Sequence, residues 1–321
     1  MDSHGSSLKV LIAALAGNVA IAICKFVAAA VTGSAAMFSE AIHSTVDTGN
    51  ELLLMHGMRR ARRPSDATHP FGYGLELYFW VFFVAVLIFG LGAVVSLIQG
   101  IDKLIHPEPI KNAVVNYVVL GLSIVFEVGS WLVAYREFDH QRGRLGLFAA
   151  VKRSKDPTVF AVLFEDSAAL IGLAMALVGI VLAEVLDMPR LDGVASIGIA
   201  CVLAATALFL GYESQSLLTG EGMFPELRQQ IEEIARGTSG VQALNQVLTM
   251  HFGPNEVLVA LSLDFDDTIS AAQVEAAVAS IERGIKTALP EVARVFVEAK
   301  SGVEAKSGVE AKSGPEQAAS A

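Results

Sequence analysis

Charged side chains are scarce in this chain of 321 residues. Asp, Glu, Lys and Arg together make up 17% of it, whereas hydrophobic residues make up 53%. Soluble domains carry about a quarter charged residues, so the composition excludes an ordinary soluble protein and indicates a membrane protein. Positive charge is the scarcer sign, with 23 Lys and Arg against 33 Asp and Glu. The net charge of −10 excludes nucleic acid as a partner, because phosphate binding needs a basic surface.

Cysteine is nearly absent as well. The sequence has two, Cys24 and Cys201, and both lie in apolar stretches. Such isolated, apolar positions are typical of small core residues and do not fit a disulfide framework.

Six apolar stretches are each long enough to cross a hydrocarbon core of roughly 30 Å, which takes about 20 helical residues. They cover residues 10–32, 35–55, 77–104, 113–134, 159–185 and 193–210. The connections after the second and fourth stretches are basic and contain Arg59, Arg60, Arg62, Arg63, Arg136, Arg142, Arg144, Lys152, Arg153 and Lys155. Because short basic loops stay cytoplasmic, we predict six membrane helices over residues 1–213 with both termini in the cytoplasm, in a bacterial inner membrane.

The composition changes near residue 214 to that of a small soluble domain. We predict helices over residues 226–236 and 271–288, and strands over 244–250, 257–265 and 293–297. This αββαβ order predicts a cytoplasmic α+β domain over residues 214–298, of the ferredoxin-like or metallochaperone-like kind. The remainder, 299–321, repeats Val-Glu-Ala-Lys-Ser-Gly and is predicted to be a disordered tail.

Several polar side chains fall inside the predicted membrane helices. Each ionisable group there costs about 2.5–3.5 kcal/mol on insertion scales, so each needs a partner or a function. The second helix holds His43 and Asp47 four residues apart, on one face, and the fifth holds an adjacent pair of acids. The candidate metal ligands on these two helices are Glu40, His43, Asp47, Asn50, Glu165 and Asp166. Imidazole nitrogen and carboxylate oxygen together suit a divalent ion such as zinc.

The depths of the two main acids agree. Asp47 lies 12 residues past Ala35, which is about 18 Å from the outer edge and about 12 Å from the inner edge. Asp166 lies 7 residues past Val159 in a helix that enters from the cytoplasm, so it is about 10 Å deep. Two acids at one depth in lipid need a cation or protons between them.

Other interpretations of these polar groups stay open. All of them can simply hold helices together through interhelical hydrogen bonds. Asn18 and Lys25 share a face of the first helix and can pair with an acid on a neighbouring helix. Glu127 in the fourth helix fits either a structural partner or part of the ion pathway.

Two motifs resemble the cation diffusion facilitator family. One is Ser-Glu-Ala-Ile-His-Ser-Thr-Val-Asp in the second helix, which ends in the HxxxD spacing of His43 and Asp47. The other is Asp66-Ala-Thr-His69-Pro-Phe-Gly-Tyr73-Gly in the loop that follows, which is similar to the family's DxxHxFGHG segment. The resemblance implies a homodimer that exchanges a cytoplasmic divalent cation, commonly zinc, for protons.

The resemblance also implies a ligand set. His43, Asp47 and Asp166 fall on ligand positions, but the fourth position is Val162, which cannot bind a metal. Glu165 is the substitute we expect, as in a divergent branch of the family that includes zinc transporters, with water, Asn50 or Glu40 as alternatives. Adjacent helix residues point about 100° apart, so Glu165 and Asp166 cannot both face the ion without rotation.

The loop motif implies a second, weaker metal site. Asp66 and His69 match its ligand positions, whereas Tyr73 stands at the third. His251 is the sole histidine after residue 214, so we do not expect the C-terminal domain to bind zinc strongly.

From these observations we predict a proton-coupled exporter of divalent cations, with zinc first and iron, cobalt or manganese behind it. The ion is cargo, and neither a cofactor nor an enzymatic activity is expected. A membrane metal sensor on the same scaffold and an intramembrane metalloenzyme are the alternatives.

Overall fold

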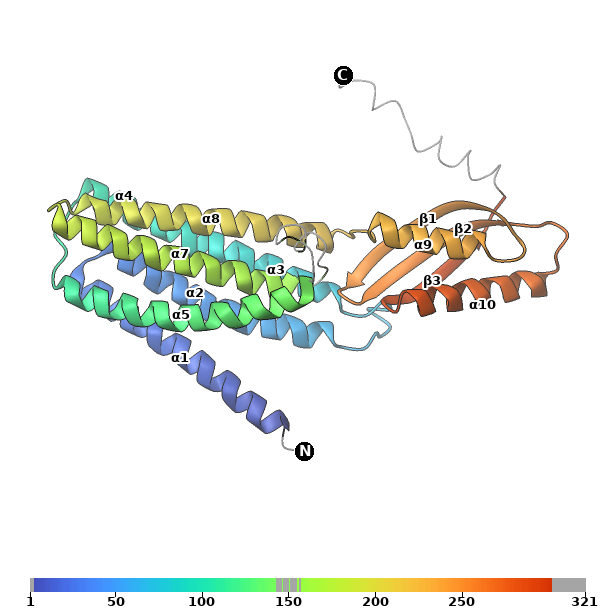
Figure 1. Cartoon of the computed structure of the whole chain (residues 1–321), viewed down its shortest axis with the longest axis horizontal. Coiled ribbons are helices and arrows are strands. Elements are labelled where there is room, and N and C mark those ends of the chain that lie inside the picture. Colours follow the sequence, from blue (N-terminus) through green and yellow to red (C-terminus); the bar gives the residue numbers. More distant parts are fainter. Residues whose placement is uncertain (1–2, 143–145, 147–149, 151–154, 156, 302–321) are drawn as a thin grey trace, which may run out of the picture. The chain divides into compact units, whose positions relative to one another are not determined.

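A computed structural model describes residues 3–142, 146, 150, 155 and 157–301 (Figure 1). The chain divides into two compact units, Met1–Arg63 with Glu76–Gln215, and Pro64–Leu75 with Ser216–Ala321. The repetitive tail from 302 onward and most of the basic segment between 143 and 156 lie outside the described residues.

In the described residues, the first unit is a bundle of six helical segments (Figure 1). They are α1 (Ser3–Thr32), α2 (Ala35–Ala61), a third segment made of α3 (Leu75–Leu87), η1 (Ile88–Ala93) and α4 (Val94–Ile105), then α5 (Ala113–Arg142), α7 (Pro157–Val185) and α8 (Arg190–Leu218). These segments confirm the predicted six-helix membrane domain. The third contains a single π-helical turn, η1, which carries Gly90 and Gly92.

Four of these segments are apolar and long enough by themselves to cross a membrane, namely Leu75–Ile105, Ala113–Arg136, Phe160–Val185 and Arg190–Leu218. A shorter apolar stretch, Asn18–Thr32, belongs to α1. Helix α2 is less apolar because it contains Glu40, Asp47 and Glu51. Its polar residues therefore depend on the neighbouring helices for shielding from lipid.

Side chains from other helices fix the N-terminal end of α2. Asp192 of α8 is fully buried and accepts hydrogen bonds from Ser34 Oγ (2.6 Å) and from the backbone N–H groups of Ala35 (2.6 Å) and Ala36 (3.2 Å). Lys103 Nζ donates to the carbonyl oxygen of Gly33 (2.6 Å). A carboxylate at this position satisfies free N–H groups and complements the positive end of the helix dipole.

Small residues let the helices approach closely. Ser39 of α2 and Ser196 of α8 are hydrogen bonded (2.6 Å), and Ser196 Oγ also donates to the carbonyl oxygen of Ser96 (2.8 Å). Many apolar side chains of α5 are exposed, among them Val114, Val118, Leu122, Val125 and Phe126. Such a face fits contact with lipid.

The second unit contains the αββαβ domain, in which α9 (Pro225–Arg236) and α10 (Ala271–Ala288) pack on a sheet of β1 (Val241–Gly253), β2 (Glu256–Phe265) and β3 (Val292–Ala299). The strand order is β1-β2-β3, with β1 and β2 antiparallel and β2 and β3 parallel. Pro225 opens α9, and Ser270 and Gln273 form a capping box that opens α10. The predicted element order is confirmed.

Candidate metal centre

His43 is the most unusual polar side chain of the bundle. It is 1% exposed, and neither of its ring nitrogens has a hydrogen-bond partner among the described residues. Its Nδ1 lies 3.1 Å from Asp47 Oδ1 on the next turn of α2, in a contact that lacks hydrogen-bond geometry. Asp47 keeps a quarter of its side chain exposed. Buried polar atoms are nearly always hydrogen bonded, so an imidazole without a hydrogen bond at either nitrogen is suited to receive a ligand.

The two adjacent acids of α7 point at different helices. Glu165 is buried and accepts a hydrogen bond from Asn50 Nδ2 of α2. Asp166 Oδ2 accepts one from Ser130 Oγ of α5 (2.9 Å). This divergence agrees with the predicted 100° separation of neighbouring helix positions. Asn50 therefore reaches Glu165, and Ser130 is a contact that the sequence did not indicate.

The acids of this region share one electrostatic environment. Asp47, Glu127 and Asp166 interact with one another and with His43, and Glu165 interacts with Asp47 and Asp166. In the part of the chain that the structure describes, however, no three His, Cys, Asp or Glu side chains are grouped closely enough to hold one metal ion. Binding of an ion here therefore requires these side chains to move closer together.

Glu40 is engaged elsewhere. Its Oε2 lies 3.1 Å from Lys25 Nζ of α1, and both side chains are almost fully buried. Lys25 Nζ also donates to Ser44 Oγ (2.7 Å), and Asn18 Nδ2 donates to Glu51 Oε1 (2.9 Å). The prediction that polar residues of the first helix pair with acids on a neighbour is confirmed.

Space for Glu40 comes from a glycine on α7. A Cβ added at Gly172 would lie 2.5 Å from Glu40 Oε1. Val162, the residue at the vacant ligand position, packs against the hydrophobic core. Neither observation gives the ion a fourth ligand.

Comparison with known proteins identifies the family. The cation efflux transmembrane domain matches residues 11–219, more than half of the chain. This chain belongs to the cation diffusion facilitator family. It is 35% identical over 263 residues to "Proton-coupled zinc antiporter SLC30A9, mitochondrial" of Xenopus laevis, a match that covers 81% of this chain and 47% of the relative. The chain thus spans about half the length of that relative.

A bacterial relative matches over a similar share of both chains. The chain is 25% identical over 259 residues to "Cation-efflux pump FieF" of Cronobacter sakazakii, and the match covers 81% of each chain. The solved nickel form of a MamM CTD variant covers 24% of this chain and 98% of its own, at 13% identity and a TM-score of 0.23.

The loop between α2 and α3 of the facilitator is closed by hydrogen bonds. Asp66 Oδ1 accepts hydrogen bonds from Thr68 Oγ1 (2.7 Å) and from the N–H groups of Thr68 and His69 (both 2.8 Å). Tyr73 OH donates to Asp66 Oδ2 (2.7 Å), and the His69 ring stacks on Tyr73 with centroids 4.1 Å apart. The hydrogen bonds from Thr68 and Tyr73 hold the pKa of Asp66 well below its usual range. The phenol thus occupies the carboxylate that a metal in this loop would need.

The same loop packs against the αββαβ domain within the second unit. Phe71 stacks on Phe252 of β1, with centroids 5.0 Å apart and an interplanar angle of 12°. Arg294 of β3 lies 5.3 Å from the Phe71 ring and donates to the carbonyl oxygen of Pro70 (2.8 Å). Gly74 is required here, because a Cβ would collide with the carbonyl oxygen of Phe252.

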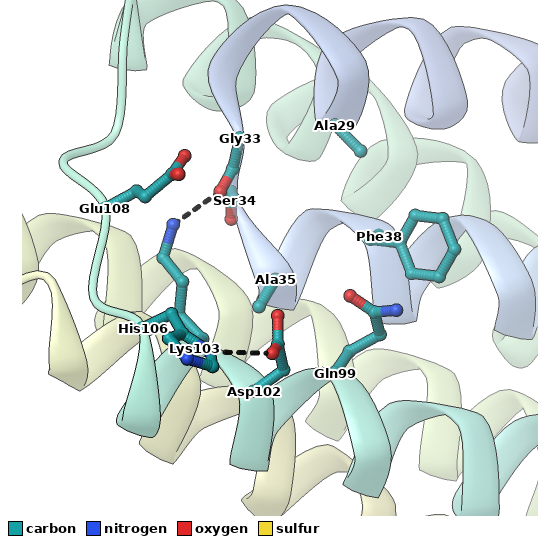
Figure 2. Close-up of a pocket in the computed structure, with 10 residues that line it drawn as sticks. All are labelled: Ala29, Gly33, Ser34, Ala35, Phe38, Gln99, Asp102, Lys103, His106 and Glu108. Carbon is teal, nitrogen blue, oxygen red and sulfur yellow. Dashed lines mark hydrogen bonds and ion pairs between the residues drawn. The ribbon is translucent and has the colours of Figure 1, made fainter.

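A pocket of about 260 Å³ lies at the N-terminal end of α2 (Figure 2). Lys103, Asp102 and His106 of the α4 end line it, and Figure 2 shows Lys103 reaching Gly33 and His106 beside Asp102. The His106 Nδ1 to Asp102 Oδ1 distance is 3.1 Å, and both side chains are exposed. His43 and Asp47 do not line the pocket, so it is separate from the candidate metal centre.

Proposed function

We propose that this facilitator exports a divalent cation in exchange for protons, with zinc as the first choice and iron, cobalt or manganese behind it. The observation that carries the proposal is the buried His43, with two unpartnered nitrogens, beside Asp47 and in electrostatic range of the α7 acids. The printed names of the relatives, a proton-coupled zinc antiporter and a cation-efflux pump, support the same activity.

The proposed transport site consists of His43, Asp47 and Asp166, with Glu165 beside them. A neutral imidazole supplies nitrogen and ionised carboxylates supply oxygen, a set that zinc accepts. Ligands must be deprotonated before a metal binds, so binding releases protons and acid displaces the ion. His43 is suited to the coupling because an imidazole nitrogen binds either a proton or a metal ion, and not both at once.

Metal flux into proteoliposomes tests the proposal. Asp47→Ala and Asp166→Ala should abolish flux in a folded protein, because each removes an anionic ligand and little packing. Glu184→Gln is the matched control, since Glu184 is an exposed acid of α7 whose partner is Tyr117. Wild-type flux should carry protons in the opposite direction and slow at acid pH. Metal binding without flux would indicate a sensor, and full flux from either alanine variant would refute the site.

The orientation and location are part of the proposal. The basic connection after α2 supports cytoplasmic termini by the positive-inside rule. The bacterial inner membrane is the proposed location, and cell fractionation decides between it and a mitochondrial membrane. The metal is cargo, and we propose no enzymatic activity.

We further propose a homodimer through the face of the sheet that α9 and α10 leave uncovered. Leu248, Ala260 and Phe296 are register partners across the three strands. Leu248 and Phe296 are 56% and 52% exposed, and such apolar rows favour association. Phe296→Asp should shift the detergent-solubilised protein from dimer to monomer in light scattering, and an unchanged mass would refute this surface.

A further inference from the structure

Glu127 of α5 is an acid at membrane depth that no step described above uses. It lies three residues before Ser130, which bonds Asp166, and four before Trp131, whose Nε1 donates to Ser167 Oγ (2.9 Å). Residues three and four apart share a helix face. Glu127 therefore lies on the face of α5 that contacts α7, one turn from the contact with Asp166.

The contacts between helices also fix the depth of Glu127. Asn50 and Glu165 contact each other, so their level serves as a reference. At 1.5 Å per residue, Asp47 lies about 4.5 Å and His43 about 10.5 Å from that level, toward the α2 N-terminus. Asp166 lies one residue beyond Glu165 and bonds Ser130, and Glu127 lies three residues before Ser130 on α5. These offsets place Glu127 about 6 Å from the reference level, in the same direction as Asp47 and His43. Glu127 thus lies at a depth between Asp47 and His43.

Glu127 has no partner of its own in the described residues. It is half-buried and makes no hydrogen bond or ion pair there, whereas Glu40 has Lys25 and Glu165 has Asn50. Its carboxylate interacts electrostatically with Asp47, Asp166, Lys25 and His43, none of which it contacts through a hydrogen bond or ion pair. A carboxylate without a partner inside a membrane helix costs free energy, so its presence there indicates a function.

A second observation, about one helical turn from the level of Glu127, points to a ligand. His43 is 99% buried, since its exposure is 1%, and both its nitrogens are unpartnered. His43 and Glu127 interact electrostatically, and no hydrogen bond links the two side chains. A divalent cation between them would satisfy both the imidazole and the carboxylates.

We propose that Glu127 is a further ligand of the transported cation, supplied by α5. This inference rests on the proposed transport function. Zinc sites commonly have four ligands, and His43, Asp47 and Asp166 supply three. Val162 packs in the core, Glu40 is held by Lys25 and Glu165 is held by Asn50. A carboxylate from α5 therefore completes the set.

Cobalt(II) binding to the purified full chain in detergent tests the assignment. Glu127→Gln keeps the size of the side chain and removes its charge. It should weaken cobalt binding by about tenfold or more, the loss of metal affinity typical when a group that supports a metal site is removed. The visible d–d absorption bands of bound cobalt should shift, because the coordination changes. Glu184→Gln, an acid outside the cluster, should change neither the affinity nor the bands.

Zinc-edge X-ray absorption then separates coordination from long-range attraction. Glu127→Ala should lose one oxygen neighbour of zinc, while Glu127→Asp should restore part of the affinity. Weaker binding with an unchanged ligand count and unchanged cobalt bands would overturn the proposal, as would wild-type affinity in folded Glu127→Gln. If Asp47→Ala abolishes flux while the Glu127 variants match wild type in metal binding, the assignment of Glu127 is refuted and the transport function stands. Absence of flux in the wild type would instead refute the transport function.

Discussion

Replacing Lys25 by methionine should destabilise the bundle strongly, and the reason is the burial of its partner. Lys25 is 2% and Glu40 0% exposed, so Lys25→Met leaves a carboxylate without a counter-charge in a dry interior. Breaking a buried pair at one end costs about 3–5 kcal/mol, whereas replacing both ends by neutral groups is often nearly neutral. The double variant Lys25→Met, Glu40→Gln should therefore be more stable than Lys25→Met alone.

Thermal unfolding of the detergent-solubilised protein measures these differences, and zinc titration of the same samples assigns Glu40. Glu40→Gln should keep most of the zinc affinity, because the structure pairs Glu40 with Lys25 and not with His43. Asn18→Leu is the control for a polar contact of α1, since its bond to Glu51 is exposed. Loss of zinc binding in Glu40→Gln with unchanged unfolding would refute the reasoning. So would a Lys25→Met variant as stable as Asn18→Leu.

Three further predictions concern the loop between α2 and α3. Tyr73→His should create a metal site with Asp66 and His69, detected as one additional bound zinc per chain; an unchanged stoichiometry contradicts it. Phe71→Ala should increase the rate at which a protease cuts the loop, relative to Phe296→Ala; equal rates would show that the stacking on the domain is unimportant. Because the pKa of Asp66 is lowered, its stabilising hydrogen bonds are present above its ordinary value near 4 and are lost only as pH falls through the lowered value. Loop cleavage should therefore not change between about pH 5 and 8, measured with a protease active over that range; a rise at pH 5 would contradict the assignment.

The helices and strands could be predicted because their signals are local. Six apolar stretches of sufficient length, and a change of composition near residue 214, are visible in the sequence alone. The helix predicted over residues 271–288 agrees with α10, and the capping box of Ser270 and Gln273 is the local signal that starts it.

The site was only partly predictable, because side-chain partners are set by packing between distant segments. Spacing placed His43 and Asp47 on one face and predicted that Glu165 and Asp166 diverge. It could not show that Asp166 turns toward Ser130, since that depends on which helix lies beside α7. The packing of the loop on the αββαβ domain left no recognisable pattern either, because it depends on single side chains far apart in the sequence.

The membership of Pro64–Leu75 in the second unit changes how that unit can be isolated. A fragment that starts at Ser216 would lack Phe71, and Phe252 would lose the ring stacked on it. Arg294 would lose both the ring and the Pro70 carbonyl that it contacts. Such a fragment would expose an aromatic surface that favours aggregation. Soluble expression would need the loop segment supplied as a fused or added peptide.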